Sequence, residues 1–230
     1  MDYDKTEIAT NYHKARALAP QTARLWQDLL SAHIDRSVIS LVIDLGCGTG
    51  RFSELLAAHL GVQVIGIDPS QKMVDQARQK PATGNVVYRQ GSGEALPLPD
   101  GCADLVFMSM IYHHLTDPTA VARECHRVLR EGGYACIRNG TRETDFPHRY
   151  FFPALRALID SDLPSRDIEA AFGAGALRLS SIRPGYRPGL AQLRRKIRPS
   201  RRLVLGAAVR RRFPTRDGRT SRSWRRNRPG

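Results

Sequence analysis

The chain has 230 residues, of which 36 are Lys or Arg and 22 are Asp or Glu, and its net charge is +14. The charge is unevenly spread: residues 1–177 hold 18 basic and 21 acidic side chains, whereas residues 178–230 hold 18 basic ones and a single acid, Asp217. This length suits one α/β domain with a sizeable core. The positive net charge belongs to residues 178–230 and is not a property of the whole chain.

Cysteine usage and apolar runs indicate the compartment. The four cysteines are scattered without a C-x-x-C pair, so the sequence predicts neither a zinc site nor a disulfide framework; they are Cys47, Cys102, Cys125 and Cys136. The chain begins MDYDKTEIA, which lacks the apolar segment of a signal peptide. No apolar run approaches the length of about 20 residues that crosses a bilayer. We therefore expect a cytoplasmic protein with reduced thiols, no metal and no membrane contact.

Helices and strands are expected in the following order. Two helices are predicted at 3–18 and 20–34, and residues 1–37 form a helical cap. Strands then alternate with helices: strands are predicted at 39–45, 62–67, 85–90, 103–108 and 134–139, and helices at 51–60, 70–80 and 117–130, with further helices near 151–160 and 165–174. The strands are apolar almost throughout, which is typical of a parallel sheet covered on both faces. We predict an α/β fold with a doubly wound, mostly parallel sheet in residues 38–177.

The end of the first predicted strand carries the most informative motif. Residues 42–50 read VIDLGCGTG, so Asp44 is followed by three alternate glycines, Gly46, Gly48 and Gly50, where a helix begins. Glycines allow a sharp turn and let a ligand lie against the peptide groups. The spacing differs from the G-x-G-x-x-G fingerprint of dinucleotide sites, because Arg51 occupies the place of the last glycine.

Two carboxylates point to the chemistry of the ligand. Asp44 would repel a pyrophosphate but suits a cationic amino-acid group, and Asp68, at the end of the second strand, can accept both hydroxyls of a ribose. A ligand with a ribose, an ammonium group and no phosphate fits S-adenosylmethionine (SAM). We therefore expect SAM as the cofactor.

Four segments in this order resemble a class I SAM-dependent methyltransferase of the small-molecule, type 11-like kind. They are VIDLGCGTG (42–50), VIGIDPSQKM (64–73), GSGEALPLPDGCADLVFMSMIYHHL (91–115) and RVLREGGYACI (127–137). The resemblance implies that the glycine loop with Asp44 holds the methionine part of SAM and that Asp68 holds the ribose. The other cofactor-binding residues that it implies are Cys47, Pro69, Met73, Ser92, Gly93, Glu94, Ser109 and Tyr12.

The loop after the third strand departs from the family pattern, which usually has an Asp that binds the adenine amino group. Here Ser92 stands between two glycines. The hydrogen bond from the adenine amino group would therefore be accepted by a neutral hydroxyl and not by a carboxylate. Charge-assisted hydrogen bonds contribute about 1.5–3 kcal/mol and neutral ones about 1 kcal/mol. We therefore predict an affinity for SAM about tenfold lower than with Asp, which Ser92→Asp would restore. Glu94 either compensates for the lost charge or is a solvated loop residue.

A catalytic base is needed only when the acceptor is an alcohol, a thiol or a protonated amine. Candidates lie in SMIYHHL (109–115), and we name His113 and Tyr112. The alternative is that Tyr112 and His113 shape the pocket while His114 packs under the end of the sheet. Tyr12 either closes over SAM as a lid or belongs to an ordinary amphipathic helix. The acceptor pocket is expected near 148–152.

Residues 178–230 form a basic tail rich in Arg and Pro. The family builds an antiparallel hairpin there, at the edge of the sheet, and this segment offers no clear candidate for it; its one apolar stretch is LVLGAAV (203–209). We predict that the tail is disordered and that the hairpin is lacking. Three explanations are open: an arm that binds nucleic acid, a solvated tail without a partner, or the product of a shifted reading frame. We favour the last, because folded elements that the fold requires are absent.

The leading hypothesis is a SAM-dependent methyltransferase that acts on a small molecule. The alternatives are a catalytically impaired SAM-binding module with an aberrant C-terminus and an RNA methyltransferase anchored by the basic tail. A nicotinamide oxidoreductase disagrees with the glycine spacing.

Overall fold

The computed structural model describes residues 19–81, 85–141, 164–173, 178–182 and 202–206. The elements are α2 (Pro20–His33), η2 (Arg36–Val38), β1 (Leu41–Leu45), α3 (Arg51–Leu60), β2 (Gln63–Asp68), α4 (Gln71–Arg78), β3 (Val86–Gln90), β4 (Ala103–Ser109), η3 (Tyr112–His114), α5 (Pro118–Val128), β5 (Leu129–Arg138), α8 (Ser165–Gly173), β6 (Arg178–Ile182) and β7 (Arg202–Gly206). The helices predicted at 3–18 and 151–160, Tyr12 and the segment 148–152 lie outside the described residues.

The strands form one sheet in the order β3-β2-β1-β4-β5-β7-β6, and every neighbouring pair is parallel. The chain first winds outward from β1 to β3 and then restarts beside β1 with β4, so the strand order reverses between these two strands. The predicted doubly wound α/β sheet is confirmed. In such sheets, ligands bind beyond the carboxyl ends of the strands at the reversal.

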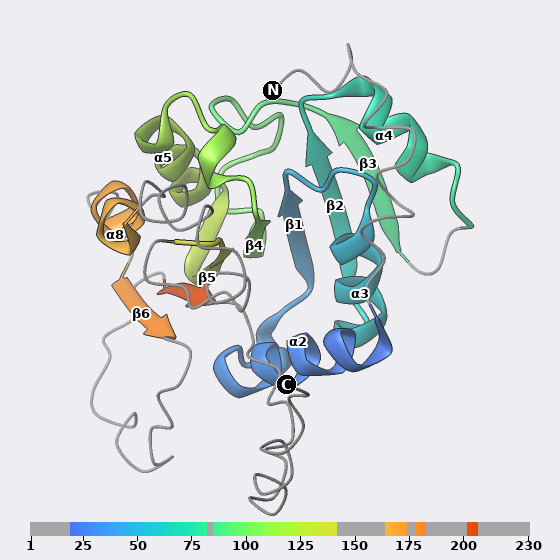
Figure 1. Ribbon diagram of the computed structural model, residues 1–230, viewed down its shortest axis with the longest axis horizontal. Coiled ribbons are helices and arrows are strands. Elements are labelled where there is room, and N and C mark those ends of the chain that lie inside the picture. Colours follow the sequence, from blue (N-terminus) through green and yellow to red (C-terminus); the bar gives the residue numbers. More distant parts are fainter. Residues whose placement is uncertain (1–18, 82–84, 142–163, 174–177, 183–201, 207–230) are drawn as a thin grey trace, which may run out of the picture.

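Two hydrophobic cores cover the two faces of the sheet. Alternate strand residues such as Val42, Leu105 and Phe107 pack with α2 and α3, and the residues between them pack with α5 and α8. Figure 1 shows α5 and α8 on one flank of the molecule, α4 on the other, and α2 at the bottom of the view below β1 and α3. This division follows from the two-residue period of a strand, which sends neighbouring side chains to opposite faces.

A buried carboxylate, Asp104, joins the start of β4 to the start of β1 by hydrogen bonds. It accepts hydrogen bonds from the Ser40 backbone N–H (2.6 Å), the Ser40 hydroxyl (2.7 Å) and the Leu41 N–H (2.8 Å). It also forms an ion pair with Arg130. Burial alone would raise the pKa of Asp104, but these bonds and the Arg130 charge outweigh it, and the net pKa is lowered.

The boundary between α5 and β5 differs from the prediction, which continued the helix to Arg130 and began the strand at Tyr134. The helix ends at Val128 and the strand begins at Leu129. Leu129 pairs with Ala103 and Tyr134 pairs with Leu105, so the register shifts within this stretch. Gly132, with a φ of 79°, lies inside the irregular start of the strand rather than at the end of the helix.

The sequence offers no clear candidate for a strand in residues 178–230, but the two segments of this stretch that the structure describes are strands. The segments Arg178–Ile182 and Arg202–Gly206 form β6 and β7, and β7 pairs with the outer edge of β5. Strand pairing uses backbone hydrogen bonds, so a run of about five residues without proline is long enough to form a strand. Within the described residues these strands run parallel to β5, and no antiparallel hairpin occurs. Their presence removes the main support for a shifted reading frame.

Two further observations concern the described residues as a whole. None of their helices is long and apolar enough to cross a membrane. The four cysteines are free thiols, and Cys47, Cys125 and Cys136 are buried.

Candidate functional site

The loop after β1 is a tight turn built from left-handed glycines. Gly46, Gly48 and Gly50 have φ values of 70°, 54° and 78°, which side chains with a Cβ rarely adopt. The N–H groups of Gly46 and Cys47 donate to the Ile67 carbonyl at 2.7 and 3.1 Å, which ties the loop to β2. Gly50 is the N-cap of α3, so the turn leads directly into the helix.

The three glycines of this loop face different surroundings. A Cβ on Gly46 would lie 2.4 Å from Ile111 Cγ2, and one on Gly50 would lie 2.1 Å from Tyr88 Oη. A Cβ on Gly48 would meet no atom within 4 Å. Packing therefore requires the first and third glycines, whereas the backbone of Gly48 faces open space in which a ligand can lie.

Asp44 is buried beneath this loop, with 1% of its surface exposed. Its Oδ2 accepts a hydrogen bond of 2.6 Å from the hydroxyl of Ser53, in the first turn of α3. Burial raises the pKa of Asp44 to about 7, the Ser53 hydrogen bond opposes the shift, and the negative charge of Asp68 adds to it. A carboxyl group in this state is stabilised as an anion by any cation that binds nearby.

Asp68 joins the glycine loop to the end of β2. Its two carboxylate oxygens accept the Gly48 N–H at 2.8 Å and the Ser70 N–H at 3.0 Å. The hydroxyl of Ser70 in turn caps α4 by accepting the Met73 N–H at 3.2 Å. Pro69 is exposed in this turn, whereas Met73 is buried. Each oxygen of Asp68 has a second lone pair, so the carboxylate can also accept bonds from a ligand.

The loop after β3 brings Ser92 and Glu94 together. The Ser92 hydroxyl donates to the Glu94 carboxylate, and the Glu94 N–H donates to Ser92 Oγ at 3.2 Å. The hydrogen bond from Ser92 is the main reason why the pKa of Glu94 is lowered. Gly93 lies against the helix α5, where a Cβ would be 3.2 Å from Val121 Cγ2. A carboxylate is therefore present beside Ser92, supplied by Glu94.

The segment after β4 forms the rim of the site. Met110 is the one non-glycine residue with a positive φ (60°) among those described, and its N–H donates to the Arg138 carbonyl at 2.6 Å. Tyr112 is buried and its hydroxyl donates to the Asp167 carbonyl at 3.1 Å. Burial raises the pKa of Tyr112, so its hydroxyl keeps its proton at neutral pH.

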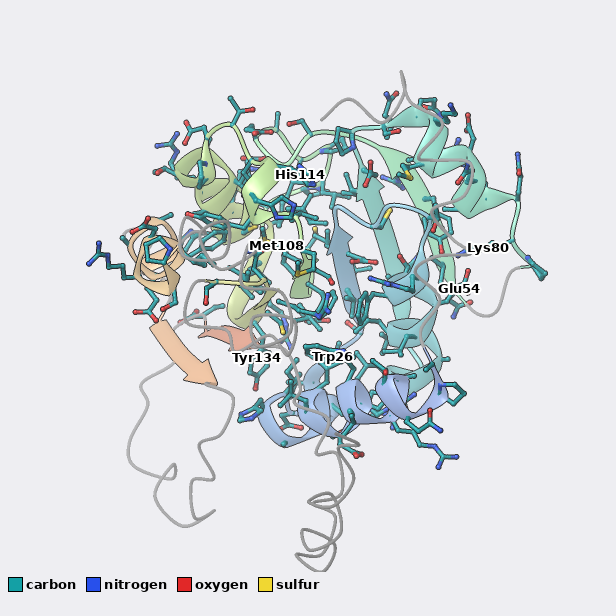
Figure 2. All side chains as sticks on the ribbon, viewed as in Figure 1. Trp26, Glu54, Lys80, Met108, His114 and Tyr134 are labelled. Carbon is teal, nitrogen blue, oxygen red and sulfur yellow. The ribbon has the colours of Figure 1, made fainter. Side chains whose placement is uncertain are left out.

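The two histidines of η3 are exposed at this rim. The rings of His113 and His114 lie 4.0 Å apart, and Figure 2 shows His114 at the end of the molecule toward which the arrows of β1 and β2 point. Partial burial and the neighbouring His113 lower the pKa of His114. The expectation that His114 packs under the sheet disagrees with its exposed position.

Sequence reasoning missed one residue at this end of the sheet, Arg138. It is the last residue of β5, and its Nη1 donates to Ser109 Oγ, at the end of β4, at 3.0 Å. The guanidinium lies over the rings of Trp26 and Phe52, with Cζ 5.1 and 5.6 Å from their centroids. No sequence motif indicates such a residue, because its partners come from three separate segments.

The arrangement fits SAM and does not favour a phosphate ligand. An open backbone at Gly48 lies beside two carboxylates, one of which has a pKa of about 7 because it is buried. Cys47 is no nucleophile here, because burial raises the pKa of its thiol well above the ordinary value.

A comparison with known families identifies the domain. Residues 43–137 match the model of a methyltransferase domain. Together with the doubly wound sheet, this match indicates that residues 43–137 form a methyltransferase domain. SAM is its cofactor.

Relatives and solved structures agree with the methyltransferase domain. The chain is 34% identical over 128 residues to the malonyl-[acyl-carrier protein] O-methyltransferase of Serratia marcescens, which covers 56% of this chain and 48% of the relative. It also resembles a SAM-dependent methyltransferase from Aquifex aeolicus (TM-score 0.51, 20% identity, 70% of this chain and 89% of that one). The [4+2]-cyclase SpnF shares the fold as well (TM-score 0.57, 20% identity, 76% and 71%).

The matched part is only a portion of the curated relatives. For four of them it covers 38%, 33%, 27% and 48% of their length. This chain therefore spans less than half the length of each of these four relatives.

Proposed function

We propose that the methyltransferase domain transfers the methyl group of SAM to a small-molecule acceptor. One observation carries this proposal: the open backbone at Gly48, flanked by Asp44 and Asp68, lies in a part of the chain without excess basic charge. Residues 1–177 hold 18 basic and 21 acidic side chains, which disfavours a surface for the phosphates of RNA.

The proposed roles follow from the positions of the residues. Asp68 holds the ribose, Asp44 favours the cationic amino-acid part, and Ser92 with Glu94 lies where the adenine amino group would bind. SAM supplies a methyl group on a sulfonium, which is an activated leaving group, so the protein mainly has to orient the two reactants.

His113 is the proposed base for acceptors that must lose a proton. Its ring is exposed at the rim after β4, whereas the hydroxyl of Tyr112 is buried and donates to a backbone carbonyl. We therefore assign Tyr112 a positioning role in η3, and a catalytic role to His113 alone.

A second candidate is a SAM-binding protein that does not transfer the methyl group. The likeness to the [4+2]-cyclase SpnF motivates it, because that protein shares the fold and is named for another reaction.

Labelled transfer tests these functions. The protein is incubated with methyl-tritiated SAM and separate pools of carboxylic acids (including carrier-bound ones), amines, phenols and total RNA. We expect label in one small-molecule pool, a loss of transfer in Asp68→Asn, and at least a tenfold lower kcat with little change in SAM affinity in His113→Ala. SAM binding without any transfer would support the second candidate, and label in RNA alone would overturn both.

A further inference from the structure

A cavity of about 390 Å³ lies between the end of α4, the start of β3 and the first turn of α3. This volume is within the range of sites that hold small molecules. None of its lining residues is among those to which we assign contacts with the cofactor. We propose that the cavity binds an α-amino acid with an apolar side chain. The proposal is independent of the proposed function, because it involves neither SAM nor the methyl acceptor.

Tyr88 separates this cavity from the glycine loop. Its side chain lines the cavity, and its hydroxyl donates to the Gly50 carbonyl at 3.4 Å. Its ring lies close against Gly66, where a Cβ would be 2.6 Å from Cδ1 of Tyr88. Figure 2 shows Glu54 and Lys80, two other lining residues, on the flank of the molecule well apart from His114 at the rim of the cofactor site. The cavity is therefore a site of its own.

Two opposite charges in the wall are only loosely paired. Lys80 Nζ lies 3.8 Å from Glu54 Oε1, which is too long for a hydrogen bond, and the two side chains are 28% and 30% exposed. Within the described part of the chain, neither the ammonium group nor the carboxylate has a hydrogen-bond partner. Charged groups that are partly removed from water favour a ligand that supplies such a partner to each.

A third charged side chain of the wall, Arg78, is already used by the protein. It donates to the Tyr88 carbonyl at 2.9 Å and pairs with Asp75 at 3.4 Å. The cavity thus offers a ligand one cation and one anion, which favours a zwitterion over a ligand with a net charge.

An α-amino acid matches both the charges and the rest of the wall. Its carboxylate and its ammonium group are attached to the same carbon, so they can reach Lys80 and Glu54 together and form a charge-assisted hydrogen bond with each. Ala77, Pro81 and Val86 supply apolar surface for the side chain of the ligand. An exposed ion pair contributes little to stability, so rearranging it around a ligand costs little.

Three ligands with the same ring test the two charges separately. L-Phenylalanine has both charged groups, 3-phenylpropanoate lacks the ammonium group, and 2-phenylethylamine lacks the carboxylate. We would measure the affinity of each by NMR titration, with S-adenosylhomocysteine at saturation so that the cofactor site is occupied.

The proteins are the wild type, Lys80→Met, Glu54→Gln and two controls that make the same charge changes outside the cavity. Arg24→Met removes an exposed cation on α2, and Asp75→Asn removes an anion of α4 that is 53% exposed.

We expect the wild type to prefer phenylalanine about tenfold over each of the other two ligands, the lower end of the range for one charge-assisted bond. Lys80→Met should lose the preference over 2-phenylethylamine and keep the preference over 3-phenylpropanoate, because only the partner of the carboxylate is removed. Glu54→Gln should show the reverse pattern. Both controls should keep both preferences.

Three outcomes would overturn the proposal. The first is a wild type that binds phenylalanine no better than its two analogues, or not at all, a result that decides the matter even if a variant fails to fold. The second is a preference that stays unchanged in Lys80→Met and Glu54→Gln, which would place the amino acid elsewhere. The third is an equal loss in the controls, which would indicate a response to net charge only. No methyl transfer is measured, so each of these results would leave the proposed function unaffected.

Discussion

Two buried aspartates at opposite ends of the sheet, Asp104 and Asp44, have opposite surroundings. Asp104, at the amino-terminal end of β4, accepts bonds from Ser40 and Leu41 and pairs with Arg130, and its net pKa is lowered. Asp44, near the carboxyl end of β1, accepts hydrogen bonds from Ser53 alone among the described residues, and its pKa is raised to about 7.

The difference separates a carboxylate that serves folding from one that serves binding. The partners of Asp104 are all part of the protein, so its charge is compensated as soon as the chain folds. Asp44 is compensated only in part, and a cationic ligand supplies the remainder. An aspartate can thus serve either folding or binding, and the groups that surround its carboxylate show which.

The largest expected effect comes from Asp104→Ala. The change leaves the N–H groups of Ser40 and Leu41 without an acceptor, and we expect the free energy of unfolding to fall by about 3 kcal/mol. Urea denaturation measures it. Asp100→Ala is the control, because Asp100 also pairs with an arginine, Arg127 at 2.7 Å, but is 79% exposed, and a loss below about 1 kcal/mol is expected. Equal losses in both variants would remove the distinction.

The next largest effects are expected from substitutions of Gly50 and Gly48, in the loop after β1. Gly50→Ala should cost about 2–3 kcal/mol of stability, because the left-handed backbone and the contact with Tyr88 both resist a Cβ. Gly48→Ala should cost about 1 kcal/mol, from the backbone alone. Thermal denaturation with and without S-adenosylhomocysteine tests this. In Gly48→Ala, the ligand-induced rise in melting temperature should decrease more than the melting temperature of the ligand-free protein. If Gly48→Ala binds the ligand like the wild type, the open space above Gly48 is not the binding site.

Asp44→Asn should act in the opposite way to Asp104→Ala. The amide resembles the protonated acid that burial favours, so stability at pH 7 should stay within about 1 kcal/mol of the wild type. The affinity for S-adenosylhomocysteine should fall by about 10- to 30-fold, because the ammonium group loses its anion. Calorimetry and urea denaturation of the same sample compare the two quantities, and a stability loss near that of Asp104→Ala would contradict the assignment.

The loop after β3 should give a smaller effect. Glu94→Gln is expected to lower SAM affinity about tenfold, if its carboxylate stands in for the aspartate of the family. Ser92→Asp should then raise the affinity about tenfold in the Glu94→Gln background, but less than threefold in the wild type, where two carboxylates would repel each other. A tenfold gain from Ser92→Asp in the wild type would show that Glu94 contributes nothing.

The smallest expected effect is on pH dependence. The pKa of Asp44 is about 7 in the folded chain, above its ordinary value, so its contribution to stability is complete below about pH 4 and is lost as the pH rises through 7. Without ligand, the free energy of unfolding should fall by about 1 kcal/mol more between pH 6 and 8 in the wild type than in Asp44→Asn. The affinity for S-adenosylhomocysteine should rise over the same range and binding should release protons, which calorimetry in buffers of different ionisation enthalpy detects. If the difference in the free energy of unfolding between the wild type and Asp44→Asn does not change from pH 6 to 8, the raised pKa is contradicted.

The first four strands and the helices between them could be predicted from the sequence, because each is a continuous apolar run or a periodic helix with a clear start. The start of β5 could not, since the Glu-Gly-Gly stretch at 131–133 is equally typical of a helix end. The strands β6 and β7 were missed because a strand at the edge of a sheet needs only backbone partners, and composition says little about those.

The site divides in the same way. The glycine loop and both aspartates follow a local spacing and could be found without a structure. Arg138 could not, because it depends on Trp26 and Phe52, which come from α2 and α3 and meet it only after folding. The role of Tyr88 against Gly50 was missed for the same reason.

The carboxylate of Asp68 has a further consequence for how fast the cofactor binds. Because it already accepts the N–H groups of Gly48 and Ser70, the turn after β1 and the turn after β2 are joined before any adenosyl compound arrives. The entropy of ordering them is lost once, during folding, and not again at each encounter. Association should therefore proceed near the speed of collision and orientation, and differences in affinity among adenosyl ligands should appear in how long each one stays.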